Sequence, residues 1–295
     1  MKAFITGING FTGRHLAKFL GQQNVRVTGA DLKKSDYHQV DLTNKQAVAE
    51  ILQQEQPDYI FHLASPVIRS DQLVDEALEK NLQVDLFGSV NLIEAAAKLK
   101  QKPKMLITGT AAEYDVEIKR ARRETDNLRP NTSYGLSKMT QELISRQLCQ
   151  SYEIPLVYTR SFLLIGPGQS QGFVITDWCR QIAAKEPLLK TGNLAIERDF
   201  TDVTDAVKAY WLLINKGKAG EVYNVCSGEK IQLKKIIDIL RKIAGYEFKV
   251  KEDKTKFRNN DPQALWGDNG KIKALGWQPE ISLEKSLKTI IENIV

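Results

Sequence analysis

The sequence predicts an α/β fold: a doubly wound parallel sheet with a smaller α/β lobe. Three observations support this prediction. Short apolar runs alternate with amphipathic segments through the first half of the chain. These runs do not alternate between apolar and polar residues, which is typical of strands in a parallel sheet that helices cover on both faces. A glycine-rich turn directly follows the first run, where a strand passes into a helix.

The elements are expected in alternating order. Strands of the first half are predicted at residues 2–6, 24–30, 59–64, 104–108 and 156–159, and helices at 11–20, 46–54, 77–100 and 133–152. After Gly168 the pattern is less regular. Helices are predicted there at 174–185, 203–213, 233–244 and 283–294, and strands at 188–190 and 222–225, with a polar, lysine-rich connection at 249–263.

The composition is that of a globular protein. The chain has 295 residues, of which 42% are hydrophobic and 26% charged. No stretch approaches the roughly 20 apolar residues that span a bilayer, so we expect no membrane partner. The start, MKAFITG, runs directly into a strand and leaves no room for a signal peptide. Three scattered cysteines indicate reduced thiols, and we expect a cytoplasmic protein.

The charge balance favours a small anionic ligand. Lys and Arg number 42 against 36 Asp and Glu, which gives a net charge of +6. The excess lysines lie on polar segments, at 98–104 and 249–256, without the interleaved aromatic residues of a nucleic-acid groove. We therefore expect no nucleic-acid partner.

The glycine-rich turn Gly7-Ile8-Asn9-Gly10-Phe11-Thr12-Gly13 predicts a dinucleotide site of the Rossmann type. Glycine permits the tight turn, lets backbone N–H groups approach a pyrophosphate, and lets helix and strand pack closely. The helix N-terminus adds free N–H donors and partial positive charge. We expect Asn9, Phe11 and Thr12 to line this site with the glycines.

Asp31 ends the second predicted strand, about 20 residues beyond the glycines, where a carboxylate can bind the adenosine ribose hydroxyls. A carboxylate there repels a 2′-phosphate, which favours NAD. The nearby cations Arg14, Lys33 and Lys34 leave NADP open as the alternative.

Tyr134 and Lys138 form a candidate acid–base pair at the start of a long predicted helix. Their spacing of four residues places them on one helix face. A free tyrosine has a pKa of about 10, and a nearby ammonium favours the phenolate. Lys138 could also bind the nicotinamide ribose. Thr110, just after the strand at 104–108, could donate a hydrogen bond to oxyanion charge on a reacting carbonyl.

Together these features resemble the extended short-chain dehydrogenase/reductase family, which acts on nucleotide-linked sugars. The resemblance covers most of the chain. Its further motifs are IFHLA (60–64), RSF (160–162), IGPGQ (165–169), GNL (192–194), RDFTDV (198–203), VYNV (222–225) and SG (227–228). Within the family, GNL…RDFTDV and VYNVCSG are most similar to GDP-4-keto-6-deoxy-mannose reductases.

The resemblance implies a role for individual residues. Tyr134, Lys138 and Thr110 would be catalytic. Cofactor contacts would come from Gly7, Gly10, Gly13, Asp31, Asp41, Leu42, Leu63, Ala64 and Ser65. The substrate would be a nucleotide-diphosphate sugar, with Arg198 and Arg258 on the diphosphate and Phe173 and Val174 near the nucleoside. Residues 1–165 with about 198–226 would form the dinucleotide-binding domain. Residues 166–197 with 227–295 would form the sugar-nucleotide lobe.

The residues after Thr110 bear on the reaction. Family dehydratases carry an acidic residue where this chain has Ala111 and Ala112, and methyl groups transfer no protons. Glu113 comes one residue later and would point elsewhere if the segment were extended. We therefore expect NAD(P)H-dependent reduction of a nucleotide-linked 4-keto-6-deoxy sugar, with Tyr134 as proton donor. The alternative is an NAD-dependent 4-epimerase. A non-catalytic NAD-binding regulator is less expected, because such proteins typically lack the Tyr/Lys pair.

Two positions depart from the family pattern. Leu163 stands where an asparagine is common, and Asp85, three residues before Gly88, also replaces an asparagine. The first removes an amide near the substrate, and the second could alter the proton relay near Lys138.

No metal site is predicted. His15, His38 and His62 share no spacing and no cysteine or acidic cluster, and His62 lies in an apolar strand. By the family resemblance, a homodimer through the helices at 77–100 and 133–152 is expected.

Overall fold

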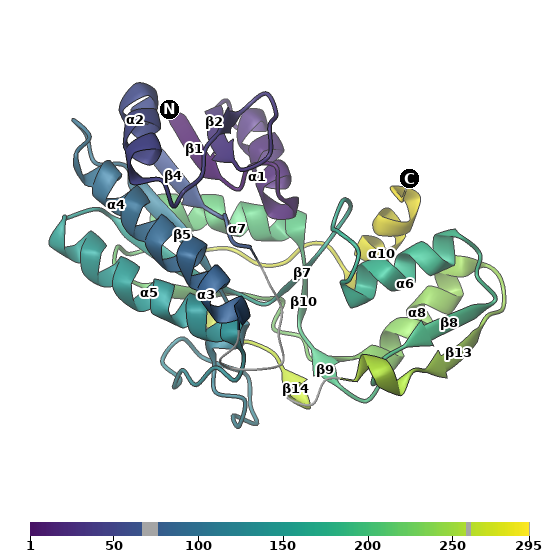
Figure 1. Ribbon diagram of the computed structural model, residues 1–295. Coiled ribbons are helices and arrows are strands. Elements are labelled where there is room, and N and C mark those ends of the chain that lie inside the picture. Colours follow the sequence, from purple (N-terminus) through teal and green to yellow (C-terminus); the bar gives the residue numbers. More distant parts are fainter. Residues whose placement is uncertain (67–75, 258–260, 295) are drawn as a thin grey trace.

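A seven-stranded parallel sheet forms the centre of the computed structural model, which describes residues 1–66, 76–257 and 261–294 (Figure 1). Its order is β11-β6-β5-β4-β1-β2-β3. The strands are β1 (Lys2–Thr6), β2 (Arg26–Asp31), β3 (His38–Gln39), β4 (Tyr59–His62), β5 (Lys104–Thr110), β6 (Leu156–Ser161) and β11 (Val222–Val225). The order reverses between β1 and β4, which is the switch point where doubly wound folds bind ligands. The predicted fold class is confirmed.

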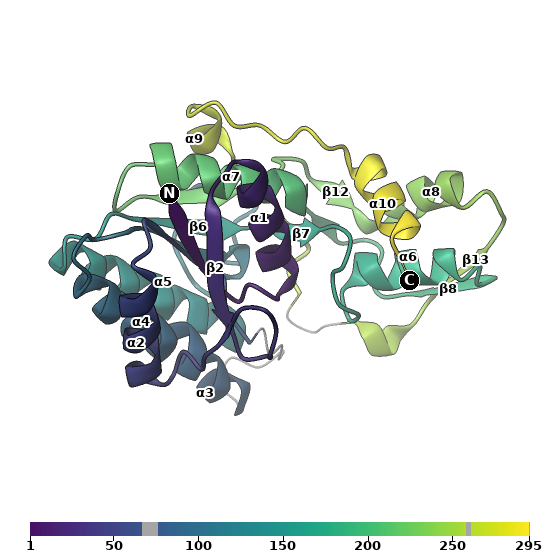
Figure 2. The same ribbon diagram turned by 90° about the horizontal axis from the view of Figure 1, so that it is seen from above.

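Helices cover both faces of this sheet (Figure 2). On one face lie α1 (Phe11–Gln22) and α7 (Val203–Lys216), which pack against each other. On the other lie α2 (Lys45–Glu55), α4 (Ser89–Ala97) and α5 (Ser133–Ser151). Each face has its own apolar core. The sheet is therefore buried on both sides, as its continuously apolar strands require.

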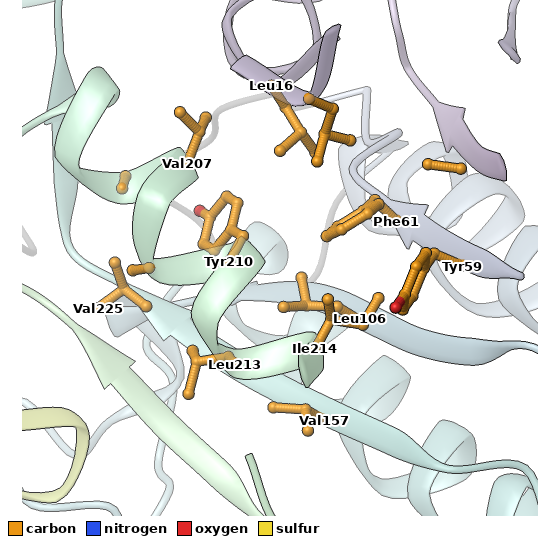
Figure 3. Packing of buried hydrophobic residues seen from close by; sticks show 14 of the residues in the cluster. Leu16, Tyr59, Phe61, Leu106, Val157, Val207, Tyr210, Leu213, Ile214 and Val225 are labelled. Carbon is orange, nitrogen blue, oxygen red and sulfur yellow. The ribbon is translucent and has the colours of Figure 1, made fainter. Parts of the chain in front are cut away.

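Figure 3 shows how the first of these cores is built. Apolar side chains of α7 pack onto the strands, next to Leu16 of α1. Those labelled on α7 are Val207, Tyr210, Leu213 and Ile214, and they face Phe61, Leu106 and Val157 of three neighbouring strands. The spacing of three and four residues along α7 explains why this helix forms here and which face it buries.

The long helix predicted at 77–100 is interrupted. The chain forms α3 (Glu76–Leu82), a π-helical segment η1 (Gln83–Gly88) and α4. The Ser89 hydroxyl donates to the carbonyl oxygen of Asp85 at 2.5 Å, and the Asp85 side chain is fully buried. A π-turn accommodates an extra residue in a helix and is often found at functional sites.

The smaller lobe lies beside the main sheet (Figure 1). It packs α6 (Val174–Ala183), α8 (Leu233–Ala244) and α10 (Leu283–Glu292) with a parallel pair of strands, β8 (Leu188–Thr191) and β13 (Lys249–Glu252). The sequence predicted a polar connection at 249–263, but its first residues form β13. A short helix, α9 (Gly270–Lys273), returns to the main domain, where Ile272 and Trp277 join the first core.

Short strands join the two parts. β7 (Leu163–Ile165) pairs with β10 (Phe200–Asp202), and β9 (Glu197–Arg198) lies between β12 (Ile231–Gln232) and β14 (Ala264–Leu265). Two short 3₁₀ turns, η2 (Ala111–Glu113) and η3 (Lys254–Lys256), complete the elements named here. Among the helices of the described ranges, none is long and apolar enough to cross a membrane.

Candidate active site

The glycine-rich turn between β1 and α1 is packed so closely that side chains are excluded. Gly7 has φ +69°, and a Cβ there would lie 2.9 Å from the backbone N and Cα of Ala64. A Cβ on Gly13 would lie 2.2 Å from the carbonyl oxygen of Gly7. Gly10 donates its N–H to that same carbonyl at 3.0 Å. The predicted tight turn and close packing are therefore both present.

The N-terminus of α1 has the features of an anion-binding helix end. Its N-cap residue is Gly10, no side chain caps the helix, and its first turn carries no acidic residue. Backbone N–H groups and the helix dipole are thus available to an anion. The side-chain amide of Asn9 donates to Ser35 Oγ, in the loop between β2 and β3, at 3.0 Å. Phe11 packs edge-on against the His15 ring, and Thr12 lies in the first helical turn.

Asp31 lies beside this turn, at the end of β2. Its carboxylate accepts the backbone N–H of Asn9 and that of Lys33, each at 3.1 Å. The predicted proximity of Asp31 to the glycine turn is present in the structure. Arg14 donates to the carbonyl oxygens of Asn9 and Gly168, so its guanidinium is held by the backbone.

The remaining predicted cofactor residues lie along the same edge of the sheet. Asp41 is exposed and accepts from the backbone N–H of Thr43, while Leu42 is buried. Leu63 and Ala64 donate their N–H groups to the carbonyl and hydroxyl oxygens of Thr6, at 3.2 and 3.3 Å. The hydroxyl oxygen of Ser65 is buried and has no hydrogen-bond partner in the described ranges.

Thr110 and Tyr134 come from two elements whose backbones are in contact. Thr110 is the N-cap of η2, and its side chain accepts from the N–H of Ala112 at 3.3 Å. Tyr134 is the second residue of α5, which Thr132 caps through the N–H of Gly135 at 3.1 Å. A Cβ on Gly135 would lie 2.3 Å from the carbonyl oxygen of Ala112. The absence of a side chain on Gly135 therefore brings the start of α5 against the turn that carries Thr110.

Lys138 lies one helical turn after Tyr134 and is almost fully buried. Its ammonium donates to Gln141 Oε1 at 2.7 Å and lies 3.6 Å from Asp85 Oδ1. Asp85 Oδ2 in turn accepts from the Ser137 hydroxyl at 2.9 Å. The structure thus supplies a buried, charged amine on the helix face of Tyr134.

Glu113 has a structural role beneath Thr110. The segment is a 3₁₀ turn rather than the extended chain considered above, and the Glu113 side chain is fully buried. Its carboxyl group accepts the Thr110 N–H at 2.7 Å. Burial and the neighbouring Glu142 raise the pKa of Glu113 well above its usual range, which the Arg160 charge opposes. Glu113 is therefore held in the interior.

Sequence reasoning missed the buried charges around Glu113. Arg160 of β6 donates to both carboxylate oxygens of Glu142, each at 2.8 Å, and to the Tyr114 hydroxyl at 3.1 Å. An arginine inside the apolar strand LVYTRS was the available signal, since a buried arginine needs an acidic partner.

The predicted substrate residues lie at two places. Phe173 is the N-cap of α6 and Val174 its first residue, both half-buried. Arg198 is buried and donates to the carbonyl oxygens of Glu197 and Pro262 at 2.7 and 2.9 Å, and to the Asp261 carboxylate. Arg258 lies outside the described residues. Leu163 is 39% exposed at the start of β7.

The histidines lie apart. His15 contacts the carbonyl oxygen of Pro167, His38 pairs with Glu55, and both ring nitrogens of His62 have partners in the interior. Within the described ranges, no three His, Cys, Asp or Glu side chains are placed to hold a metal ion.

Comparison with known proteins places this geometry in context. Residues 3–226 match the model of the NAD dependent epimerase/dehydratase family. The chain is 30% identical to a GDP-6-deoxy-D-mannose reductase of Pseudomonas aeruginosa, over 99% of this chain and 96% of that protein. It is 26% identical to a UDP-glucuronate 4-epimerase of Thermodesulfobacterium geofontis, over 97% and 94%. The structure of RMD from Pseudomonas aeruginosa complexed with NADPH is similar, with a TM-score of 0.88, 29% identity and coverage of 99% and 98%.

Proposed function

Because the chain belongs to the NAD dependent epimerase/dehydratase family, and so to the NAD(P)-dependent enzymes of nucleotide-sugar modification, we propose that it is a reductase. It would reduce the 4-keto group of a nucleotide-linked 4-keto-6-deoxy sugar, of the GDP-4-keto-6-deoxy-mannose type. The observation that carries this proposal is the contact of Gly135 with Ala112, which brings the first turn of α5 against the turn that Thr110 caps. Tyr134 and the buried Lys138 both lie on that helix. The likeness to a GDP-6-deoxy-D-mannose reductase over nearly the whole chain supports it.

In this proposal each catalytic residue has one task. The reduced nicotinamide, when bound, supplies a hydride to C4 of the sugar. The Tyr134 hydroxyl donates the proton to the C4 oxygen as negative charge develops on it. The Thr110 hydroxyl donates a hydrogen bond to the same oxygen. The Lys138 ammonium stabilises the phenolate that remains on Tyr134.

The cofactor would bind along the carboxyl ends of β1, β2 and β4. The uncapped N-terminus of α1 would take the pyrophosphate, and Asp31 the adenosine ribose, which favours NAD over NADP. Leu63 and Ala64 would line the opposite side, close to Gly7. Asn9, Phe11, Thr12, Asp41 and Leu42 complete this proposed surface.

The nucleotide-diphosphate sugar would lie between the sheet and the smaller lobe. Phe173 and Val174, at the N-terminus of α6, would contact the nucleoside. Arg198 and Arg258 would bind the diphosphate. Arg198 is paired with Asp261 in this structure, so a diphosphate there would compete with that carboxylate.

Loss of water to form a 4-keto-6-deoxy sugar is disfavoured, since that reaction needs a further acid and base near C6. Ala111 and Ala112 carry no ionisable group, and Glu113 is buried beneath Thr110. The second candidate is a 4-epimerase, which would use the same three catalytic residues. The carboxylate of Asp31 and the likeness to a UDP-glucuronate 4-epimerase favour it.

An assay with freshly prepared GDP-4-keto-6-deoxy-mannose and NADH or NADPH tests the proposal. Oxidation of the reduced cofactor with formation of a 6-deoxy sugar supports a reductase. Interconversion of UDP-glucose and UDP-galactose, or of their uronic acids, without added cofactor would instead establish an epimerase. Tight cofactor binding without turnover of any of these sugars would indicate a regulator and overturn both.

A homodimer through residues 77–100 and 133–152 is part of the proposal. Phe87 of η1 is 51% exposed and Leu143 of α5 is 69% exposed, so both of these segments present a large apolar side chain at the surface. Sedimentation of the wild type and of Leu143→Glu tests it, with Leu32→Glu as the control at another exposed leucine. A monomeric wild type would contradict it.

A further inference from the structure

A line of buried hydrogen bonds runs from Thr6, at the end of β1, to Lys138 on α5. Thr6 Oγ1 lies 2.6 Å from His62 Nδ1, and His62 Nε2 lies 2.9 Å from Ser89 Oγ. Gln141 Nε2 lies 2.8 Å from Ser89 Oγ, and Gln141 Oε1 lies 2.7 Å from Lys138 Nζ. All five side chains are at most 2% exposed. The line therefore crosses the interior from the end of β1, next to the glycine-rich turn, to the amine of Lys138.

The direction of each bond follows from Ser89. A hydroxyl has one proton, and Ser89 donates it to the carbonyl oxygen of Asp85. Ser89 Oγ must then accept from both His62 Nε2 and Gln141 Nε2. His62 is therefore protonated on Nε2, and its Nδ1 accepts from the Thr6 hydroxyl. Burial and the Lys138 charge lower the pKa of His62 to about 3, so the neutral ring is maintained at neutral pH.

The same argument fixes the amide of Gln141. With its N–H directed at Ser89, its carbonyl oxygen must face Lys138. A flipped amide would direct its N–H donors at the ammonium, which is also a donor. Its oxygen would then face Ser89, whose only proton is already donated to Asp85. Lys138 is thus held by one oriented acceptor, and Asp85 adds a carboxylate at 3.6 Å that the Ser137 hydroxyl keeps in place.

We propose that Gln141 is the positioning residue for Lys138, and that Ser89 and His62 keep Gln141 in the orientation this needs. The line also connects Lys138 to Thr6 through hydrogen bonds. The Thr6 hydroxyl accepts from the N–H of Ala64, which follows β4 and lies close to Gly7. An amide passes no proton without changing tautomer, so the line orients the amine and does not conduct protons. The inference rests on the proposed role of Lys138.

Several charged and titratable groups surround the Lys138 amine, and each could contribute to the pH dependence of kcat. Asp85 faces Lys138 from η1, His62 from β4, and Tyr134 precedes it on α5. Burial and the charges of Glu113 and Glu142 raise the pKa of Tyr158. The Tyr158 hydroxyl donates to the Lys138 carbonyl oxygen at 3.1 Å. Of these groups, Tyr134 is the one whose proton the proposed reaction transfers.

Gln141→Leu tests the proposal, because it removes the acceptor and keeps the volume. Loss of a hydrogen bond to a charged group predicts a fall in kcat of about ten-fold or more, with KM and cofactor affinity changed less than about two-fold. The limb of the pH profile that reports Tyr134 should shift to higher pH, because the ammonium is no longer fixed near the phenol. Ser145→Ala is the control: it removes an equally buried hydroxyl of α5 that has no partner in the described ranges. It should leave kcat, KM and the pH profile unchanged.

The tautomer of His62 provides a readout that needs no turnover. Nitrogen-15 NMR of histidine-labelled protein should show His62 protonated on Nε2 in the wild type and in Gln141→Leu. Ser89→Ala should change that signature, since His62 Nε2 loses its acceptor. A wild-type ring protonated on Nδ1, or Gln141→Leu with unchanged kcat and pH profile, would overturn the proposal. If no sugar is turned over, the NMR result still decides the orientation of the line, separately from the proposed function.

Discussion

Gly135 and Ala112 are in backbone contact: a Cβ on Gly135 would lie 2.3 Å from the carbonyl oxygen of Ala112, closer than atoms can approach. The two residues follow Tyr134 and Thr110 in the chain, by one and two positions. The contact therefore sets the distance between the first turn of α5 and the turn after β5. Thr110 and Tyr134, two of the three proposed catalytic residues, lie on these two elements.

Gly135→Ala should separate these two elements. Relief of the overlap requires a backbone shift, which we expect to cost about 1–3 kcal/mol of stability and to lower kcat by ten-fold or more. Denaturant unfolding and steady-state assays measure the two effects. Gly21→Ala, at a helical glycine with no atom near the added Cβ, should be neutral or slightly stabilising. Full activity of Gly135→Ala would show that the contact does not position Tyr134.

Tyr134→Phe should abolish proton donation while leaving the cofactor site intact. Removal of a positioned general acid predicts a loss of about 10²–10⁴ in kcat, with cofactor binding retained. Tyr152→Phe, at the exposed end of α5, is the matched control and should be fully active. Retained turnover in Tyr134→Phe would remove the basis of the proposed mechanism.

The sequence predicted six of the seven strands of the main sheet because each is a run of four or more residues; β3, with two polar residues, was missed. The strands β7, β9, β10, β12 and β14 have only two or three residues each and left no periodic signal. The π-turn at Asp85 was missed because it depends on contacts with Ser89 and α5. The glycine turn and Asp31 were predicted from their spacing, and they lie side by side in the structure. The roles of Tyr134 and Lys138 rest on the surrounding motifs as well and stay a prediction.

Contacts between side chains that are distant in the sequence were harder to predict. Arg198 was expected to face a diphosphate, yet it pairs with Asp261, 63 residues further on. Gln141 was overlooked because a polar residue on a helix is usually exposed, whereas this one is buried between Lys138 and Ser89. The pairing of Arg198 and the burial of Gln141 depend on tertiary packing, which cannot be read from residue type and spacing.

Asp31→Asn should shift cofactor preference towards NADP. The carboxylate now accepts from Asn9 and Lys33, and its negative charge would oppose a 2′-phosphate placed there. Removing that repulsion predicts a change of about ten-fold or more in the ratio of NADP to NAD affinity. Titration of both cofactors measures it. Asp238→Asn, on the exposed face of α8, makes the same change in net charge and should leave the ratio unaltered. An unchanged ratio in Asp31→Asn would place the ribose elsewhere.

Glu113→Gln should alter how stability depends on pH. In the unfolded chain Glu113 loses its proton near the ordinary pKa of 4.5, whereas in the folded protein burial and Glu142 hold that pKa well above this value. Between the two pKa values the unfolded chain binds fewer protons, so the free energy of unfolding falls as the pH rises above about 4.5. Glutamine has no proton to lose and keeps an oxygen for the Thr110 N–H, so the decline of the unfolding free energy above about pH 4.5 should be smaller in the variant. Urea unfolding at several pH values measures this, and Glu229→Gln, at an exposed carboxylate, should keep the wild-type slope. Equal slopes in Glu113→Gln and the wild type would show that Glu113 ionises normally in the folded protein.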